Sequence, residues 1–558
     1  MNTRTRIEYG RLARTAAMGL LLLASLATTV GAQQRKFYDD DPIAREPNTR
    51  DASGANPRDI DLMYDLAMNL FALQRYPNLV RARNVNTIDE LPDSEWFTNR
   101  ILARPVDIGE AVKGPDTGGG PAPGKLIVTR AKRSGVTPGF TLKDSAGQTW
   151  FVQFDAPGQS EAASGSAVVA TKLFHALGYF QTENYISYLD PANLEVDAQA
   201  KVDTPSGRVR SMTLDDIRKV LDRADKRPDG TYRMLASRAI PGRVIGGFKY
   251  VGTRKDDPND IVPHEHRREL RALKVFGAWT NLVDMKALNT LDTVITENGR
   301  GVIRHYLQDV GSTFGTGARA PREWDEGYEY IFEGDKTMKR LATVGFYLQP
   351  WQTVPYTEYE SVGRFEGDSF APEEWKPRIP TAAFLNARAD DNFWAARRVM
   401  AFSDELIRAI VKTGQYSDPS AEKHLADVLI KRRDKIGKAY LPAVNPLVDF
   451  RLDASGILTF ENAAVSAGFA SAPRGGYEAR WYRFDNGNGG ASPIGAPARS
   501  QDLRIPAPAG LPAGDGEFIK VEVAAIDPPH SSWSVPVHVY FRRLPAGWKL
   551  VGLERMPD

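Results

Sequence analysis

The pattern of hydrophobic and polar positions changes twice along the chain. Short β-type runs follow one another from Leu126 to Leu189, and one helical pattern, Glu161 to Leu177, lies between them. Apolar residues recur mostly at helical spacing over 327–445, and alternating runs with Gly and Pro turns follow from about Val448. The pattern predicts an α+β fold with a β-rich part, a mostly helical part and a C-terminal β-sandwich.

These changes divide the chain into five predicted parts. The first is a leader, and the second is an N-terminal extension that ends in the linker-type Gly and Pro cluster 116–124. A β-rich lobe with one helix, a helical lobe and the β-sandwich complete the chain. The predicted parts are 1–32, 33–124, 125–190, 191–445 and 446–558.

The first 32 residues have the pattern of a cleavable signal peptide. Arginines precede the apolar run Ala16 to Ala27, which is too short for a comfortable membrane span, and small residues lead to Ala32. Cleavage after Ala32 predicts an exported protein, periplasmic or extracellular, with no integral membrane span. An uncleaved N-terminal anchor is the alternative.

Composition excludes several classes of function. The chain has no cysteine, so disulfides, thiol catalysis, cysteine-ligated zinc and a lipid anchor on cysteine are excluded. The net charge of +2 includes four arginines of the leader. The chain beyond the leader has no basic stripe of the kind that binds nucleic acid. No Gly-x-Ser-x-Gly motif is present, which disfavours the common α/β type of serine hydrolase.

The stretch 267–315 carries the strongest candidate chemistry. A helical pattern from Arg267 to Trp279 leads into a loop with Asp284 and Asn289. Two β-type runs follow, 291–296 and 302–307, and the Asn-Gly between them is a strong hairpin signal. The second run leads to Asp309, followed by Val310 and Gly311.

Phosphoryl transfer requires three oxygen-bearing side chains of these types. One carboxylate lies near the incoming hydroxyl, an amide holds a metal ion, and a second carboxylate bridges the metal to the phosphates. Asp284, Asn289 and Asp309 occur in that order, and Gly311 would permit a sharp turn after the metal ligand. The alternative is chance spacing followed by an ordinary Asp-x-Gly turn.

Two resemblances follow from these motifs. Over nearly all of the chain beyond the leader, the sequence resembles a family of secreted bacterial proteins, which implies export but no activity. Over about 125–445 it is similar in outline to the divergent HipA, CotH and secretory-pathway kinases, which implies a two-lobed protein-kinase-like core that binds Mg²⁺ and ATP. The segments that carry the first resemblance are 36–42, 257–268 and 305–309.

The β-rich lobe supplies weaker candidates for binding the nucleotide. Gly135 and Gly139 lie between two predicted strands, where a kinase-like lobe places its phosphate-covering loop, although a plain hairpin turn fits equally well. Glu161 begins the helix and is the candidate positioning residue. The lysine expected on the preceding strand is replaced by Gln153, which carries no charge to offset phosphate.

Lys143 and Lys172 are the two lysines that can compensate for Gln153, and both are more often solvated surface residues. Three further features are left open or assigned to structure. One is a group that lacks the His-Glu-x-x-His spacing of a metal site: His264, Glu265, His266 and Glu269. The second is His305, which faces either the site or the core. The third is the loop 485–490, which lacks the carboxylates of a calcium loop.

Two classes of function remain. The first is an exported phosphotransferase that uses a metal-nucleotide to modify a protein, glycan or lipid hydroxyl, with nucleotidyl transfer as a variant. The second is a catalytically silent scaffold whose C-terminal domain contacts an envelope protein or glycan. Gln153 favours the second, and the set Asp284, Asn289 and Asp309 favours the first.

Overall fold

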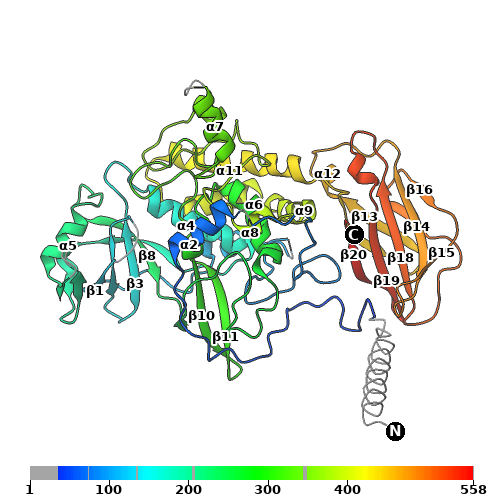
Figure 1. Cartoon of the computed structure of the whole chain (residues 1–558), viewed down its shortest axis with the longest axis horizontal. Helices are drawn as coiled ribbons and strands as arrows, with labels where there is room; N and C mark the ends of the chain where they lie inside the picture. The colour runs from blue at the N-terminus through cyan, green and yellow to red at the C-terminus, as the bar shows by residue number, and fades with distance from the viewer. Residues whose placement is uncertain are drawn as a thin grey trace, which may run out of the picture.

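The computed structural model describes residues 35–72, 74–102, 104–132, 136–203, 208–343 and 348–556. The fold mixes helices with several sheets, as predicted. A sheet lies at one end, a helical body with a hairpin beneath it occupies the middle, and a second β-rich region lies at the other end (Figure 1). The predicted leader 1–32 lies outside the described residues. Within those residues, no helix combines the length and apolar character that a membrane crossing requires.

The first sheet has six strands in the order β4-β8-β3-β2-β1-β5. Its strands are β1 Leu126–Ala131, β2 Gly139–Lys143, β3 Thr149–Phe154, β4 Asn184–Leu189, β5 Leu194–Val196 and β8 Tyr232–Arg238. β5 runs parallel to β1, and the other pairs are antiparallel. Trp150, Val152 and Phe154 alternate into a core shared with helix α5 (Leu214–Leu221). The outer hairpin is β6 Lys201–Asp203 with β7 Val209–Ser211.

Helix α4 (Ala162–Leu177) packs on this sheet through Ala167 and Val168, which contact Leu235 of β8 and Ile186 of β4. It ends at Gly178, whose φ of 132° is a backbone conformation that residues with a Cβ rarely adopt. The prediction of a helix that ends at this glycine is confirmed.

Helix α6 (Arg268–Thr280) is the centre of the helical body, and residues on all its sides are buried. The chain then forms the short 3-10 helix η3 (Ala287–Asn289) and the hairpin β10 (Thr290–Glu297) and β11 (Arg300–Leu307), which β9 (Arg243–Val244) extends. Asn298 and Gly299 have φ of 50° and 75°, the values of a two-residue hairpin turn. The predicted hairpin is confirmed.

Further helices complete the helical body. They are α2 Leu62–Phe71, α3 Ile108–Lys113, α7 Gly334–Ala342, α8 Ala382–Leu385, α9 Ala389–Met400, α10 Asp404–Lys412 and α11 Pro419–Tyr440. Among them, α8, α9 and α11 contact α6 directly. The remaining 3-10 turns are η1 Pro191–Asn193, η2 His264–His266, η4 Pro350–Thr353 and η5 Ser531–Ser534.

The C-terminal region contains two antiparallel sheets. The first has the order β12-β13-β17, and the second has β15-β14-β18-β19-β20 with β16 beside β14. The elements are β12 Leu447–Leu452, β13 Ile457–Asn462, α12 Ala463–Ser466, β14 Tyr477–Phe484, β15 Ala491–Pro493, β16 Ala498–Ser500, β17 Arg504–Pro506, β18 Phe518–Ala525, β19 Val537–Leu544 and β20 Gly547–Glu554. Inward residues of β18, such as Val521 and Val523, are fully buried.

The N-terminal extension connects the C-terminal region with the helical body. Phe37 packs against Phe484, Phe518 and Tyr540, and the chain then runs beneath the molecule to α2 (Figure 1). The end of the extension differs from a free linker, because Asp116 forms an ion pair with the buried Lys172 of α4. The extension is therefore integrated in the fold.

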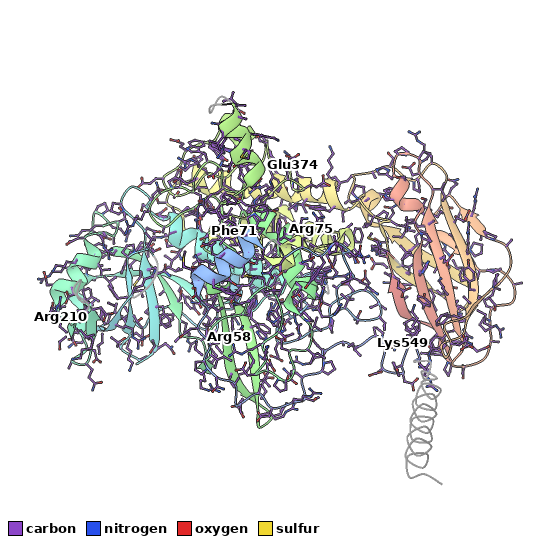
Figure 2. All side chains as sticks on the ribbon, viewed as in Figure 1. Arg58, Phe71, Arg75, Arg210, Glu374 and Lys549 are labelled. Atoms are coloured by element: carbon purple, nitrogen blue, oxygen red, sulfur yellow. The ribbon has the colours of Figure 1, made fainter. Side chains whose placement is uncertain are left out.

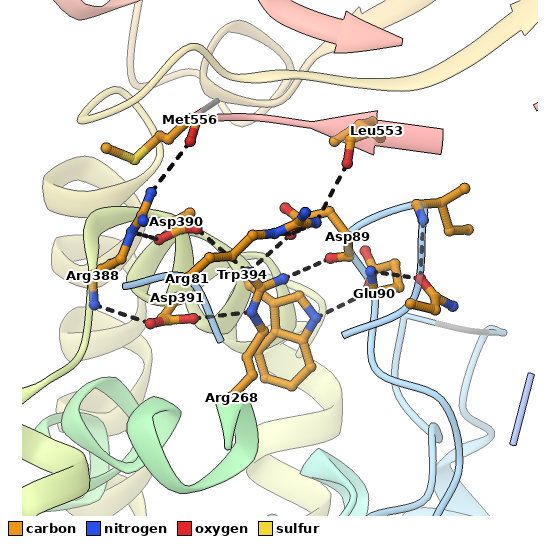
Figure 3. A network of polar contacts seen from close by, with 12 residues as sticks. Arg81, Asp89, Glu90, Arg268, Arg388, Asp390, Asp391, Trp394, Leu553 and Met556 are labelled. Carbon is orange, nitrogen blue, oxygen red and sulfur yellow. Dashed lines mark hydrogen bonds and ion pairs between the residues drawn. The ribbon is translucent and has the colours of Figure 1, made fainter. Parts of the chain in front are cut away.

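A buried charge network joins the extension, the helical body and strand β20 (Figure 3). Arg268 is fully buried and forms ion pairs with Asp89 and Asp391 at 3.0 Å each. Burial alone would lower the pKa of Arg268, but these carboxylates together with Asp390 raise it above its usual value. Arg81 extends the network by donating to the carbonyl of Leu553.

We predict that Arg268→Met destabilises the protein by about 1.5–3 kcal/mol, because Asp89 and Asp391 each lose one charged partner and keep Arg81 and Arg271, respectively. Thermal unfolding followed by circular dichroism measures the loss. The control is Arg480→Met, which removes a more exposed guanidinium paired with Glu478 and should shift the midpoint little. Equal midpoints for Arg268→Met and the unmodified protein would contradict this role.

Candidate functional site

The structure brings Asp284, Asn289 and Asp309 together. The Asn289 backbone carbonyl accepts hydrogen bonds from the N–H groups of Gln308 at 3.0 Å and Asp309 at 3.1 Å. The Asn289 side-chain amide donates to the Asp284 backbone carbonyl at 2.8 Å. The loop before the hairpin and the chain after it therefore form one polar surface.

Lys286 belongs to this surface and was missed in the sequence. Its Nζ lies 2.7 Å from Oδ2 of Asp284, and both side chains are partly exposed. A lysine two residues after the proposed base and three before the amide is the signal that was available. The ion pair fixes one oxygen of Asp284 and leaves the other accessible.

Asp309 is exposed at the end of β11, and its Oδ1 accepts from the N–H of Gly311 at 3.1 Å. Gly311 is required for a different reason from the predicted one. Its φ is outside the left-handed region, but a Cβ there would lie 3.3 Å from the Cβ of Ala167 on α4. Glycine thus permits close packing of this loop against the helix.

Lys132 supplies a positive charge that interacts with Asp309. It follows β1 directly, and its Nζ donates to the Thr137 carbonyl at 3.1 Å. Partial burial lowers the pKa of Lys132, and the negative charge of Asp309 opposes that shift. Lys132 was not predicted, because its interaction with Asp309 is a tertiary one that no local pattern encodes.

The predicted nucleotide-binding residues of the first sheet have other environments. Gln153 pairs with Gly139 across β2 and β3, and a Cβ at Gly139 would lie 2.2 Å from the Val152 carbonyl oxygen. Gly139 is thus required by strand pairing. Lys143 is exposed at the opposite end of β2 from Gly139, and Gly135 lies outside the described residues.

Glu161, the candidate positioning residue, contacts Ser417 and Arg233 in this structure. Its carboxylate accepts from Ser417 N–H at 2.7 Å and lies 4.0 Å from Arg233 of β8. Lys172, one of the two compensating lysines, forms an ion pair with Asp116 and also donates to the Lys113 carbonyl. Both residues therefore connect α4 to neighbouring segments.

Helix α2 contacts η3, and the sequence did not predict this contact. The Asp65 carboxylate accepts from Ala287 N–H in η3. Burial raises the Asp65 pKa above its ordinary value, although the positive charge of Lys249 and this hydrogen bond lower it. Tyr250 lies close to Asp65 and Asp284, and burial is the largest cause of its raised pKa. A segment more than 200 residues earlier thus positions η3.

The histidines near the site are structural. His264 binds Asp260 at 2.8 Å, and His305 faces the core, where it binds Asp292 at 2.7 Å and stacks on Trp96. Glu265 accepts from Tyr76, which accounts for one more member of the predicted group. Over the described ranges, three or more His, Asp and Glu side chains nowhere gather as a metal-binding cluster.

No protein-family model and no curated protein matches the sequence. Two solved structures of a Golgi casein kinase match the chain at low TM-score. The one with Mn/ADP bound has 11% identity, a TM-score of 0.29, and coverage of 71% of this chain and 94% of that chain. The other has 10% identity, a TM-score of 0.27, and coverage of 72% and 97%. At these TM-scores, the chemistry of this site has to be argued from its own geometry.

We predict that Asp65→Ala raises the rate of amide hydrogen exchange in a peptide covering 284–290 by about fivefold, because the lost hydrogen bond is worth about 1 kcal/mol. Mass spectrometry measures the exchange. Asp65→Asn is the matched control, since its Oδ1 still accepts from Ala287 and no charge is buried. Unchanged exchange in Asp65→Ala would show that α2 does not hold η3.

Proposed function

We propose that the chain is an exported kinase-like phosphotransferase with a two-lobed core and a C-terminal β-sandwich, and that it uses Mg²⁺ and ATP to modify a hydroxyl of a protein, glycan or lipid. Export depends on the predicted leader alone. The activity depends on one observation: Asn289 hydrogen-bonds to the backbone of both Asp284 and Asp309, which places these three residues side by side.

The side chains present fit a magnesium ion. Asn289 uses its Nδ2 as a donor, so its side-chain oxygen is left for a ligand. Asp309 is exposed and engages Oδ1 with Gly311, which leaves Oδ2 without a hydrogen bond among the described residues. Carboxylate and amide oxygens are suitable magnesium ligands, and the bound ion would neutralise phosphate charge.

The two lysines complete the charge balance. Lys132 replaces the expected strand lysine, because its positive charge approaches Asp309 from the β1–β2 loop while Gln153 is neutral. Lys286 holds one oxygen of Asp284, so the other is oriented to accept the proton of an incoming hydroxyl. Asp284 is therefore assigned as base, and Asn289 and Asp309 as metal ligands.

A catalytically silent scaffold is the second candidate. Gln153 occupies the position where a kinase-like lobe has its lysine, and Glu161 binds Ser417 and Arg233 in place of a strand lysine. The two candidates differ in one observable property, the consumption of ATP.

We predict that Mg²⁺ with ATP raises the thermal unfolding midpoint, and that Asp309→Ala abolishes the rise because a metal ligand is lost. Lys132→Met should reduce the rise, since a cation near the phosphates is removed. Lys143→Met is the matched control, because it removes an exposed lysine from the adjacent strand. A rise that survives in Asp309→Ala would refute the assigned nucleotide site.

We predict that Asp284→Asn retains the nucleotide-induced rise but lowers phosphate release from ATP by about a hundredfold or more, because a general base contributes about 10²–10⁴-fold. The release is measured with radiolabelled ATP. Binding of ATP without any turnover by the unmodified protein, tested with protein, glycan and lipid acceptors, would favour the scaffold.

A further inference from the structure

A second candidate site lies away from the proposed phosphotransfer surface. It is a cavity of about 350 Å³ between the end of α6, helix α11 and the chain around α7. Figure 2 labels Glu374, one of its lining residues, near α7. Six aromatic rings form part of its wall, those of Tyr328, Trp351, Tyr356, Phe365, Phe370 and Trp375.

Arg432 of α11 lines this cavity and is only 5% exposed. Its guanidinium carbon lies 3.8 Å from the ring centre of Phe370 and 4.5 Å from that of Phe365. Its Nε and Nη1 have no hydrogen-bond partner within the described part of the chain. The Arg432 guanidinium therefore lies between two aromatic rings, and two of its nitrogens donate no hydrogen bond.

The surrounding groups do not neutralise Arg432 by direct contact. Glu366 engages one carboxylate oxygen with the Tyr328 hydroxyl at 3.2 Å and the other with the Ser369 N–H at 2.8 Å. Burial lowers the Arg432 pKa to about 10, although Glu366 raises it. Arg268, by contrast, is equally buried but has carboxylates at 3.0 Å.

We propose that this cavity binds a small molecule with one carboxylate and a ring, the carboxylate on Arg432 and the ring against the aromatic wall. Arginine binds carboxylates through two parallel hydrogen bonds, and a buried charge without a partner is costly. A cavity of this volume falls within the size range of small-ligand sites.

The charges of the wall favour a single negative charge on the ligand. Glu326, Glu366 and Glu374 also line the cavity, so a doubly charged phosphate would meet three carboxylates. Two lysines line it as well, but both pair with carboxylates outside the lining: Lys336 with Glu329 and Glu333, and Lys376 with Glu333 at 2.8 Å. Arg364, which lines the cavity as well, stacks on Trp324 and donates to the Arg322 carbonyl. A monocarboxylate therefore suits this mixture of charges better than phosphate.

The test is isothermal titration of the purified protein with three probes: benzoate, glucuronate and inorganic phosphate. The expected result is saturable binding of at least one carboxylate and weaker binding of phosphate. Arg432→Gln should weaken carboxylate binding at least tenfold, whereas Asp309→Ala should bind as the unmodified protein does. The last comparison separates this site from the proposed phosphotransfer site.

Two further variants keep the test decisive. Arg433→Gln removes the adjacent guanidinium of α11, which pairs with Asp404 and Asp434, and should leave binding unchanged. Ala371→Phe adds a ring at an exposed lining position and should block binding without touching Arg432. The proposal is overturned if neither carboxylate binds, if Arg432→Gln binds equally while folded, or if phosphate binds most tightly.

Discussion

The ion pairs of Arg268 are the interaction on which the rest of the architecture depends. Arg268 begins α6, and its partners come from the N-terminal extension and from α9. A fully buried cation is costly unless carboxylates approach it closely, so the ion pairs of Arg268 favour the joint assembly of these segments. The same assembly fixes the end of α6, from which the loop with Asp284 and Asn289 begins.

The register of one hairpin then sets the geometry of the candidate site. Thr290 pairs with Leu307, so the residues just outside the hairpin, Asn289 and Asp309, come into hydrogen-bonding contact. The turn at Asn298 and Gly299 determines that register, because a shift by one residue would move every side chain to the other face. Two side chains that are distant in sequence thus meet because a turn lies midway between them.

This dependence explains which parts of the site were predictable. The Asn-Gly turn and the β-type runs are local signals, so the meeting of Asn289 with Asp309 followed from the sequence. Lys132 and Asp65 reach the site from other segments, through a loop conformation and a helix contact that no local pattern encodes. The burial of Arg268 was equally hidden, because periodicity treats arginine as a surface residue.

Helix α2 buries polar side chains and exposes apolar ones, in contrast to an ordinary amphipathic helix. Asp65 and Asn69 are buried, whereas Met63 is 71% exposed and Phe71 is 67% exposed. Figure 2 labels Phe71 on this helix, and the centre of its ring lies 5.4 Å from the centre of the Phe332 ring. The cost of exposing apolar side chains is offset in part by the hydrogen bond from Ala287 to Asp65. The buried side of α2 therefore combines Asp65 and Asn69 with Leu70, while Met63 and Phe71 remain exposed.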